Sequence, residues 1–169
     1  MKSEHWDCFL NCKGWYSYVG KCSLTVALPI ISAFGVETSV LPTAVLSTHT
    51  AFKGFTFRDL TDDLENIASH WENQKINFDS IYTGYLGSFK QLEIVSDIFK
   101  KFKTDKNIII VDPVMGDNGK LYPGFDQKFA LSMANLCASA DIIVPNLTEA
   151  SFMLNQPYVA NGYDENYVK

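Results

Sequence analysis

Short apolar runs and helical apolar stripes alternate along this chain from residue 20 onward. Four runs rich in β-branched or aromatic residues have the length of buried strands, at residues 36–41, 78–83, 108–111 and 142–144. Five segments around them repeat their apolar residues at helical spacing, at residues 23–34, 59–71, 88–102, 125–138 and 147–154. This alternation is typical of a mostly parallel sheet with helices on both faces.

Several of these elements also have end signals. Ser23 predicts the N-cap of the first helix and Gly35 its end, while Pro29 predicts either a kink or a late start. Ser88 predicts the cap of a later helix. The run at residues 108–111 predicts a strand covered on both faces. A short strand is also expected at residues 8–10, although residues 1–18 as a whole show no clean period.

Polar residues and glycines gather directly after the predicted strands. Loops of this kind are expected at residues 46–57, 84–87, 112–122 and 145–149. The carboxyl ends of parallel strands meet at one edge of a sheet, and open α/β sheets bind ligands there. We therefore expect these loops to form a single site.

The strongest candidate segment reads Asp-Pro-Val-Met-Gly-Asp at residues 112–117. A buried strand delivers Asp112 at its carboxyl end, and Gly116 and Gly119 let the following loop fold closely around a ligand. Asp112 and Asp117 then supply hard oxygen ligands of the kind that Mg²⁺ accepts beside water and phosphate. The alternative is an Asp-Pro turn followed by a solvated Asp-Asn-Gly turn.

A second candidate segment reads Pro-Asn-Leu-Thr-Glu at residues 145–149. Asn146 and Glu149 have the spacing of a capping box, which is an adequate structural role by itself. The functional alternative uses the same geometry, because a helix N-terminus favours anions. Asn146 and Glu149 would then help to hold a metal-bound phosphate, the Glu through water.

Two further segments offer contacts for a small polar ring. Hydroxyl groups and one histidine crowd residues 43–50, where a structural role for His49 is favoured over acid–base use. Gly84 and Gly87 flank Tyr85 and permit close approach of a flat ligand. The alternative is a simple strand-to-helix turn with Tyr85 in the core.

Composition narrows the function classes. A net charge of -5 and a pI of about 5.1 argue against sequence-independent nucleic-acid binding, which depends on Lys and Arg. The 4 cysteines form no C-x-x-C pair and no zinc-ligand spacing. Neither a secretory leader nor an apolar run long enough for a membrane span is recognisable, so we expect a cytoplasmic protein with no membrane partner.

Taken together, these segments resemble pyridoxal (vitamin B6) kinases of the ribokinase-like superfamily. The resemblance covers about residues 20–158. It is carried by Gly-Lys-Cys-Ser-Leu-Thr at residues 20–25, Ser-Thr-His-Thr at residues 47–50, Tyr-Thr-Gly-Tyr-Leu-Gly-Ser at residues 82–88, and the two segments at residues 112–117 and 145–149. We expect one domain over residues 1–169 with an α/β/α sandwich fold, incomplete at its C-terminus.

The resemblance implies transfer of the ATP γ-phosphoryl to the 5′-hydroxyl of pyridoxal, pyridoxine or pyridoxamine, with Mg²⁺. By motif position, the substrate contacts are Ser17, Thr50 and Tyr85. The nucleotide contacts are Asp112, Asp117, Asn146, Thr148 and Glu149, and the metal contacts are Asp112, Asp117 and Glu149. The family is often dimeric, so a homodimer is expected.

No catalytic residue is assigned. The family's base lies in a Gly-Thr-Gly-Asp segment that residues 1–169 do not contain, so we expect weak or absent kinase activity of the chain alone. Two alternatives stay open. One is a non-catalytic remnant or binding module, and the other is a kinase of a different small alcohol, such as hydroxymethylpyrimidine.

Overall fold

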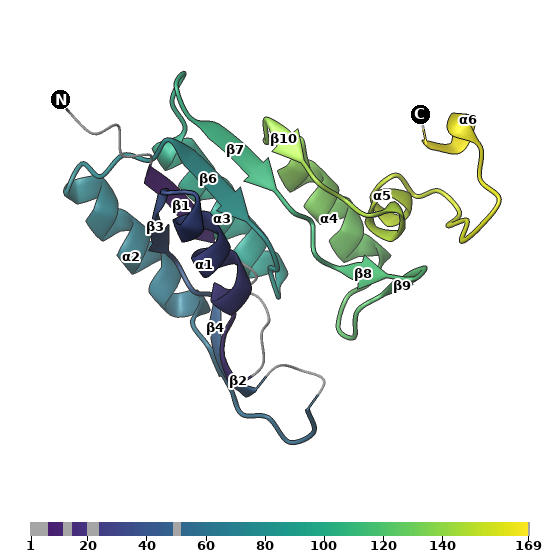
Figure 1. Ribbon diagram of the computed structural model, residues 1–169, viewed down its shortest axis with the longest axis horizontal. Helices are drawn as coiled ribbons and strands as arrows, with labels where there is room; N and C mark the ends of the chain where they lie inside the picture. The colour runs from purple at the N-terminus through teal and green to yellow at the C-terminus, as the bar shows by residue number, and fades with distance from the viewer. Residues whose placement is uncertain (1–6, 12–14, 20–23, 49–51, 169) are drawn as a thin grey trace.

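A five-stranded parallel sheet forms the centre of the molecule (Figure 1). The structure is a computed structural model and describes residues 7–11, 15–19, 24–48 and 52–168. The strand order is β10-β7-β6-β1-β3, and every neighbouring pair is parallel. The strands are β1 (Asp7–Asn11), β3 (Glu37–Val40), β6 (Ser80–Thr83), β7 (Ile108–Val111) and β10 (Ile142–Ile143).

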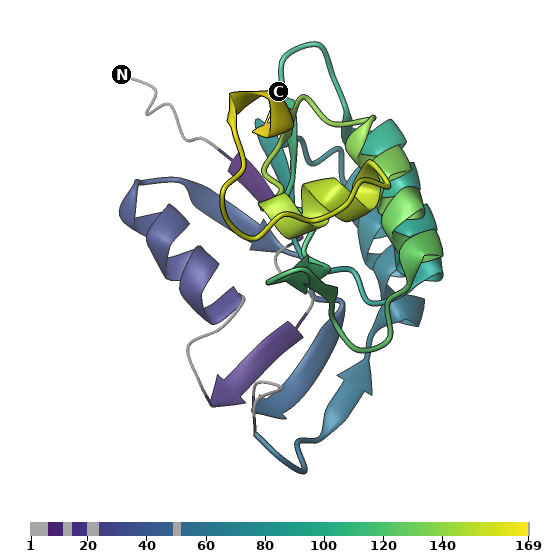
Figure 2. The same cartoon turned by 90° about the vertical axis from the view of Figure 1, so that its right-hand side faces the viewer.

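Helices cover both faces of this sheet, and the predicted three-layer α/β/α fold is confirmed. Helix α1 (Leu24–Ala33) lies on one face, as Figure 2 shows. The opposite face carries α2 (Thr61–Asn73), α3 (Phe89–Phe102) and α4 (Gln127–Cys137). Two short helices, α5 (Leu147–Met153) and α6 (Glu165–Val168), follow β10.

Most of the buried core lies between the sheet and helices α2, α3 and α4. The predicted apolar face of α3 is buried there, from Leu92 to Phe102. Strand β7 departs from the prediction of cover on both faces. Ile109 and Val111 are buried toward the three helices, whereas Ile108 is 42% exposed. The α1 side has a much smaller cluster around Leu24.

The predicted loop at residues 46–57 is too long, because strands occupy both of its ends. A second sheet has the order β2-β4-β5, formed by β2 (Trp15–Val19), β4 (Ala44–Thr48) and β5 (Phe57–Asp59). Strand β4 is parallel to β2 and antiparallel to β5. The small sheet lies beyond the end of the main sheet toward which β6 and β7 run (Figure 1).

The predicted loop at residues 112–122 contains a hairpin. Strands β8 (Gly116–Asp117) and β9 (Lys120–Leu121) pair across a two-residue turn. Asn118 and Gly119 at this turn have φ of 51° and 75°, the left-handed region that asparagine and glycine tolerate. The Asp-Asn-Gly pattern was therefore read correctly as a turn, but not as part of a paired hairpin.

Helix ends follow local chemistry closely. Helix α1 runs through Pro29 without a late start, and Pro29 lies on its exposed side. Gly35 has φ of 78° after the helix, as its stop signal predicts. The Ser88 side chain accepts from Gln91 N, and Asp126, which was not predicted as a cap, does the same for Phe129 N. Among the described residues, none of the helices is long and apolar enough to cross a membrane.

Candidate functional site

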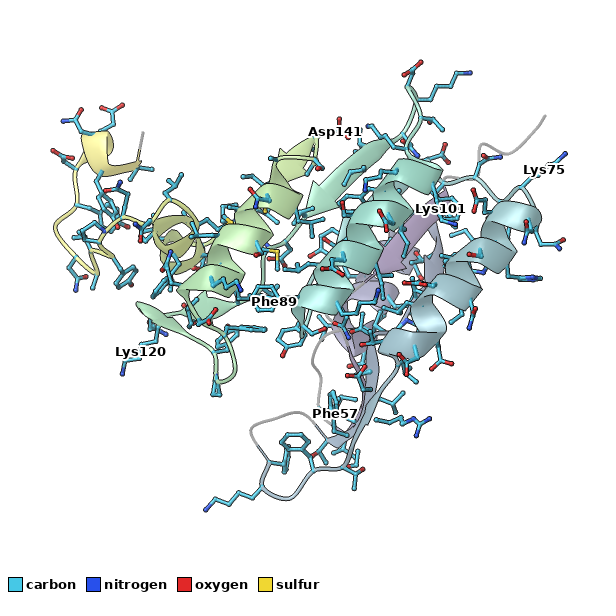
Figure 3. All side chains as sticks on the ribbon, turned by 180° about the vertical axis from the view of Figure 1, so that it is seen from behind. Phe57, Lys75, Phe89, Lys101, Lys120 and Asp141 are labelled. Carbon is cyan, nitrogen blue, oxygen red and sulfur yellow. The ribbon has the colours of Figure 1, made fainter. Side chains whose placement is uncertain are left out.

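Three of the four predicted strand-following loops leave the main sheet at the same edge. Strands β6, β7 and β10 are parallel neighbours, so the segments after Thr83, Val111 and Ile143 leave the sheet on the same side. The predicted loop at residues 46–57 instead follows β4 and ends at β5 of the small sheet. In Figure 3, Lys120, from the hairpin after β7, lies well below Asp141, which precedes β10.

Hydrogen bonds join the start of α5 to the loop after β7. Asn146 and Glu149 form the predicted capping box, in which Asn146 Oδ1 accepts from Glu149 N at 3.0 Å and Glu149 Oε2 accepts from Asn146 N at 2.9 Å. Glu149 Oε1 also accepts from Met115 N at 3.3 Å, and Asn146 Nδ2 donates to Gly116 O at 2.9 Å. Both oxygens of the Glu149 carboxylate are thus committed to backbone donors.

Glu149 is only 3% exposed, and its environment disfavours ionisation. Burial raises the pKa of Glu149 most, and the negative charge of Asp112 raises it further. The backbone donors of Asn146 and Met115 lower the pKa, but the net direction is upward. The negative charge of Asp112 thus opposes the ionisation of Glu149.

Asp112 lies at the carboxyl end of β7, half-buried. Its Oδ2 accepts from the Tyr82 hydroxyl at 3.1 Å, a contact that the sequence analysis missed. Tyr82 lies in the neighbouring strand β6, two positions before Gly84. The regular parallel pairing of β6 with β7 could have placed Tyr82 beside this strand, but not its hydroxyl on Asp112.

Asp117 is exposed on the hairpin, and its carboxylate accepts from the backbone and side chain of Asn118 at 2.8 and 3.1 Å. Gly119 N donates to Thr148 Oγ1 at 2.9 Å, which fastens the hairpin to α5. A Cβ at Gly119 would lie 2.5 Å from Tyr158 Cδ1, so only glycine fits between the turn and this ring. Within the described ranges, no three His, Cys, Asp or Glu side chains form a metal-binding group.

The loop after β6 carries Tyr85, which is half-buried. Its ring lies 5.5 Å from that of Phe125 between centroids, and burial raises the pKa of the Tyr85 hydroxyl. The half-buried Tyr85 is not among the buried core residues, so the alternative that places it in the core is not met. The loop begins at the carboxyl edge of the main sheet, beside the segment that carries Asp112.

Of the other two predicted substrate contacts, Ser17 and Thr50, the structure describes only Ser17. Ser17 is 1% exposed, and its hydroxyl donates to Val19 O at 2.8 Å within β2. Thr50 and His49 lie outside the described residues. Two hydroxyls that the sequence analysis did not single out, those of Thr48 and Thr83, are buried without a hydrogen-bond partner in the described part of the chain. Each ends a strand, β4 or β6.

Comparison with known proteins gives consistent matches. Residues 31–165 match the family profile of phosphomethylpyrimidine kinase. The pyridoxal kinase of Dictyostelium discoideum is 32% identical over 152 residues, covering 85% of this chain and 49% of its own. A crystal structure of a putative phosphomethylpyrimidine kinase from Bacteroides thetaiotaomicron is 44% identical, with a TM-score of 0.92 over 98% of this chain and 57% of its own.

Pyridoxal kinase from Lactobacillus plantarum gives a further structural match, 34% identical with a TM-score of 0.84, covering 95% of this chain and 56% of its own. The chain thus spans about half the length of the curated relatives it matches. The matched region includes all three loops at the carboxyl edge of the main sheet. This chain belongs to the phosphomethylpyrimidine kinase family of ribokinase-like proteins, together with the pyridoxal kinases that it resembles.

Proposed function

We propose that this chain provides the binding site for Mg²⁺ and nucleotide, and the loop that binds the vitamer, in a pyridoxal kinase. The reaction is ATP-dependent phosphorylation of the 5′-hydroxyl of pyridoxal, pyridoxine or pyridoxamine. The observation that carries the nucleotide part is the buried Glu149 carboxylate at the N-terminus of α5, which accepts a hydrogen bond from the loop that begins with Asp112. The choice of a B6 vitamer as the substrate is supported by the Bacteroides relative, which is 44% identical and was crystallised with pyridoxal.

The residues present fit Mg²⁺ with few protein ligands. Mg²⁺ commonly takes one or two carboxylates and leaves its other positions to water and phosphate oxygens. Asp112 is the direct ligand in this proposal, and Glu149 acts through water, since both its oxygens already accept backbone N–H groups. When bound, the cation would neutralise charge on the transferred phosphoryl group.

The polypeptide around the cation positions the phosphates. The N-terminus of a helix favours anions, and α5 begins directly after Asn146. Thr148 accepts a hydrogen bond from Gly119 N and so holds the β8–β9 hairpin, which carries Asp117, against the start of α5. Asn146, Thr148 and Asp117 are therefore proposed as nucleotide-side residues. Tyr85, Ser17 and Thr50 are proposed on the vitamer side.

Calorimetric titration with ATP and Mg²⁺ tests the nucleotide part. Asp112→Asn keeps the shape of the side chain and removes its charge, so we expect at least about a tenfold weaker affinity for Mg²⁺–ATP. The matched control is Asp97→Asn, which changes an exposed aspartate paired with Lys100 on α3. Equal affinities for wild type and Asp112→Asn, or no Mg²⁺-dependent binding at all, would contradict the proposal.

Phosphorylation of a hydroxymethylpyrimidine is a second candidate, favoured by the family profile and by the description of the Bacteroides relative. Direct titration with pyridoxal and with hydroxymethylpyrimidine separates the two candidates. Tighter binding of pyridoxal supports the proposal, and tighter binding of the pyrimidine replaces it. A homodimer stays a prediction, which size-exclusion chromatography with light scattering tests.

A further inference from the structure

A chain of hydrogen bonds joins the loop at residues 84–87 to the small sheet. Gly87 N donates to Gln91 Oε1 at 2.7 Å, and Gln91 Nε2 donates to Thr61 Oγ1 at 2.8 Å. The Thr61 hydroxyl then donates to Asp59 Oδ1. Gln91 is 3% exposed, so its amide would be costly to bury without these two partners. We call these three bonds the Gly87–Asp59 relay.

The relay has one direction. Each group donates to the next, and the last acceptor is a carboxylate, which makes the final bond charge-assisted. Bonds arranged in this order polarise one another. Thr61 is the first residue of α2 and Gln91 lies in the first turn of α3, so the relay crosses between two packed helices.

Each end of the relay is anchored in a different part of the fold. Asp59 is the last residue of β5 and is the register partner of Ala44 in β4, and Leu60 N donates to Thr43 O. At the other end, a Cβ on Gly87 would lie 3.3 Å from Tyr85 Cε1. The Tyr85 ring therefore lies directly against the Gly87 backbone. The position of this ring depends on where the relay holds Gly87.

We propose that Gln91 and Thr61 are positioning residues that fix Tyr85 relative to the small sheet. This inference rests on the proposed function, in which Tyr85 contacts the vitamer. Neither residue touches the vitamer in the proposal. They act by holding the loop at residues 84–87 in register with β4 and β5, so that Tyr85 and the hydroxyl-rich end of β4 face the ligand at a constant separation.

The first experiment follows amide exchange at Gly87 by NMR in the unliganded chain. Thr61→Val removes the hydroxyl without changing the shape of the side chain. We expect Gly87 to exchange about fivefold faster, which corresponds to about 1 kcal/mol. Thr61→Ser restores the hydroxyl and should exchange like the wild type. In a Gln91→Leu background, Thr61→Val should have no additional effect. The relay is overturned if Thr61→Val leaves the Gly87 exchange rate unchanged. It is also overturned if Thr61→Val has its full effect in the Gln91→Leu background.

The second experiment measures pyridoxal and Mg²⁺–ATP affinities of the same variants. Thr61→Val is expected to weaken the affinity for pyridoxal about fivefold and to leave the affinity for Mg²⁺–ATP unchanged. General damage to the fold would weaken both affinities. Thr61→Ser should recover the wild-type pyridoxal affinity. Equal loss of both ligands in Thr61→Val overturns the positioning role. If the wild type itself binds no pyridoxal, the proposed function fails, and the Gly87 exchange rates still decide the relay.

Discussion

Both ends of the main sheet hold a carboxylate that accepts backbone N–H groups, but the two pKa values move in opposite directions. At the amino end, Asp141 Oδ2 accepts from Lys103 Nζ at 2.6 Å and from Ile109 N at 2.7 Å. The hydrogen bond from Lys103, followed by that from Ile109, lowers the pKa of Asp141. At the carboxyl end, burial raises the pKa of Glu149.

The other polar groups at the two ends follow the same contrast. Asn107 is 4% exposed at the amino end, where its amide donates to Phe78 O and Phe102 O and accepts from Thr104 N. At the carboxyl end, the Thr83 hydroxyl is fully buried and has no partner among the described residues. The amino end is thus organised for stability. The carboxyl end keeps polar groups in costly surroundings, as binding sites do.

The largest predicted effect is at Glu149. Glu149→Ala leaves the N–H groups of Met115 and Asn146 without their acceptor in a buried place, and we expect a loss of about 3 kcal/mol in the free energy of unfolding. Urea denaturation measures it. Glu149→Gln keeps one acceptor and removes the charge, so its loss should be smaller, about 1 kcal/mol. A greater loss for Gln than for Ala would contradict this assignment.

Asn107→Ala tests the opposite end. It removes three hydrogen bonds from a buried site and should lower the free energy of unfolding by about 2 kcal/mol. Because Asn107 lies away from the carboxyl edge, the Mg²⁺–ATP affinity of the folded protein should stay unchanged. A combined measurement of urea stability and calorimetric affinity checks both statements, and a weakened nucleotide affinity would break the contrast between the two ends.

Thr83→Val is expected to change stability in the favourable direction. The Thr83 hydroxyl has no hydrogen-bond partner in the described ranges. Valine has the shape of threonine without this hydroxyl, so the substitution should stabilise the protein by about 1 kcal/mol. Thermal unfolding of the variant beside Thr43→Val provides the comparison, since Thr43 is also buried but has an interaction partner. A destabilised Thr83→Val would mean that the hydroxyl has a partner in solution.

Asp141→Asn should give the smallest effect and the clearest pH dependence. A carboxyl group with a lowered folded pKa contributes stability above its unfolded pKa of about 3.9, and that contribution disappears as the pH falls through the folded value. Wild type should therefore be more stable than Asp141→Asn at pH 7, and the two should converge below about pH 3. Urea unfolding over this range measures the difference. A gap that persists at low pH would exclude the ion pair as its cause.

Local signals explain what could be predicted. The caps at Ser88 and Asn146 act within one helical turn, so α3 and α5 begin where their sequences predict. The parallel order of β6, β7 and β10 follows from alternation of strands and helices, and it brings the loop that begins with Asp112 to Glu149. These are consequences of short-range chemistry and general topology.

Long-range pairings explain what could not. Residues 46–57 contain glycine and many hydroxyls, yet β4 becomes a strand because β2 and β5 pair with it. Gln91 and Thr61 are 30 positions apart, and no local pattern relates them. In each case the deciding partner is distant along the chain.

The environment of Cys137 has a chemical consequence. Its thiol is buried where α4 packs on α5 and lies 3.7 Å from the sulfur of Met153, and burial raises the pKa of Cys137 to about 11. Thiolate is the reactive form, so alkylating reagents at neutral pH meet almost none of it while the two helices stay together. The rate at which Cys137 is labelled therefore reports how often α4 transiently separates from α5.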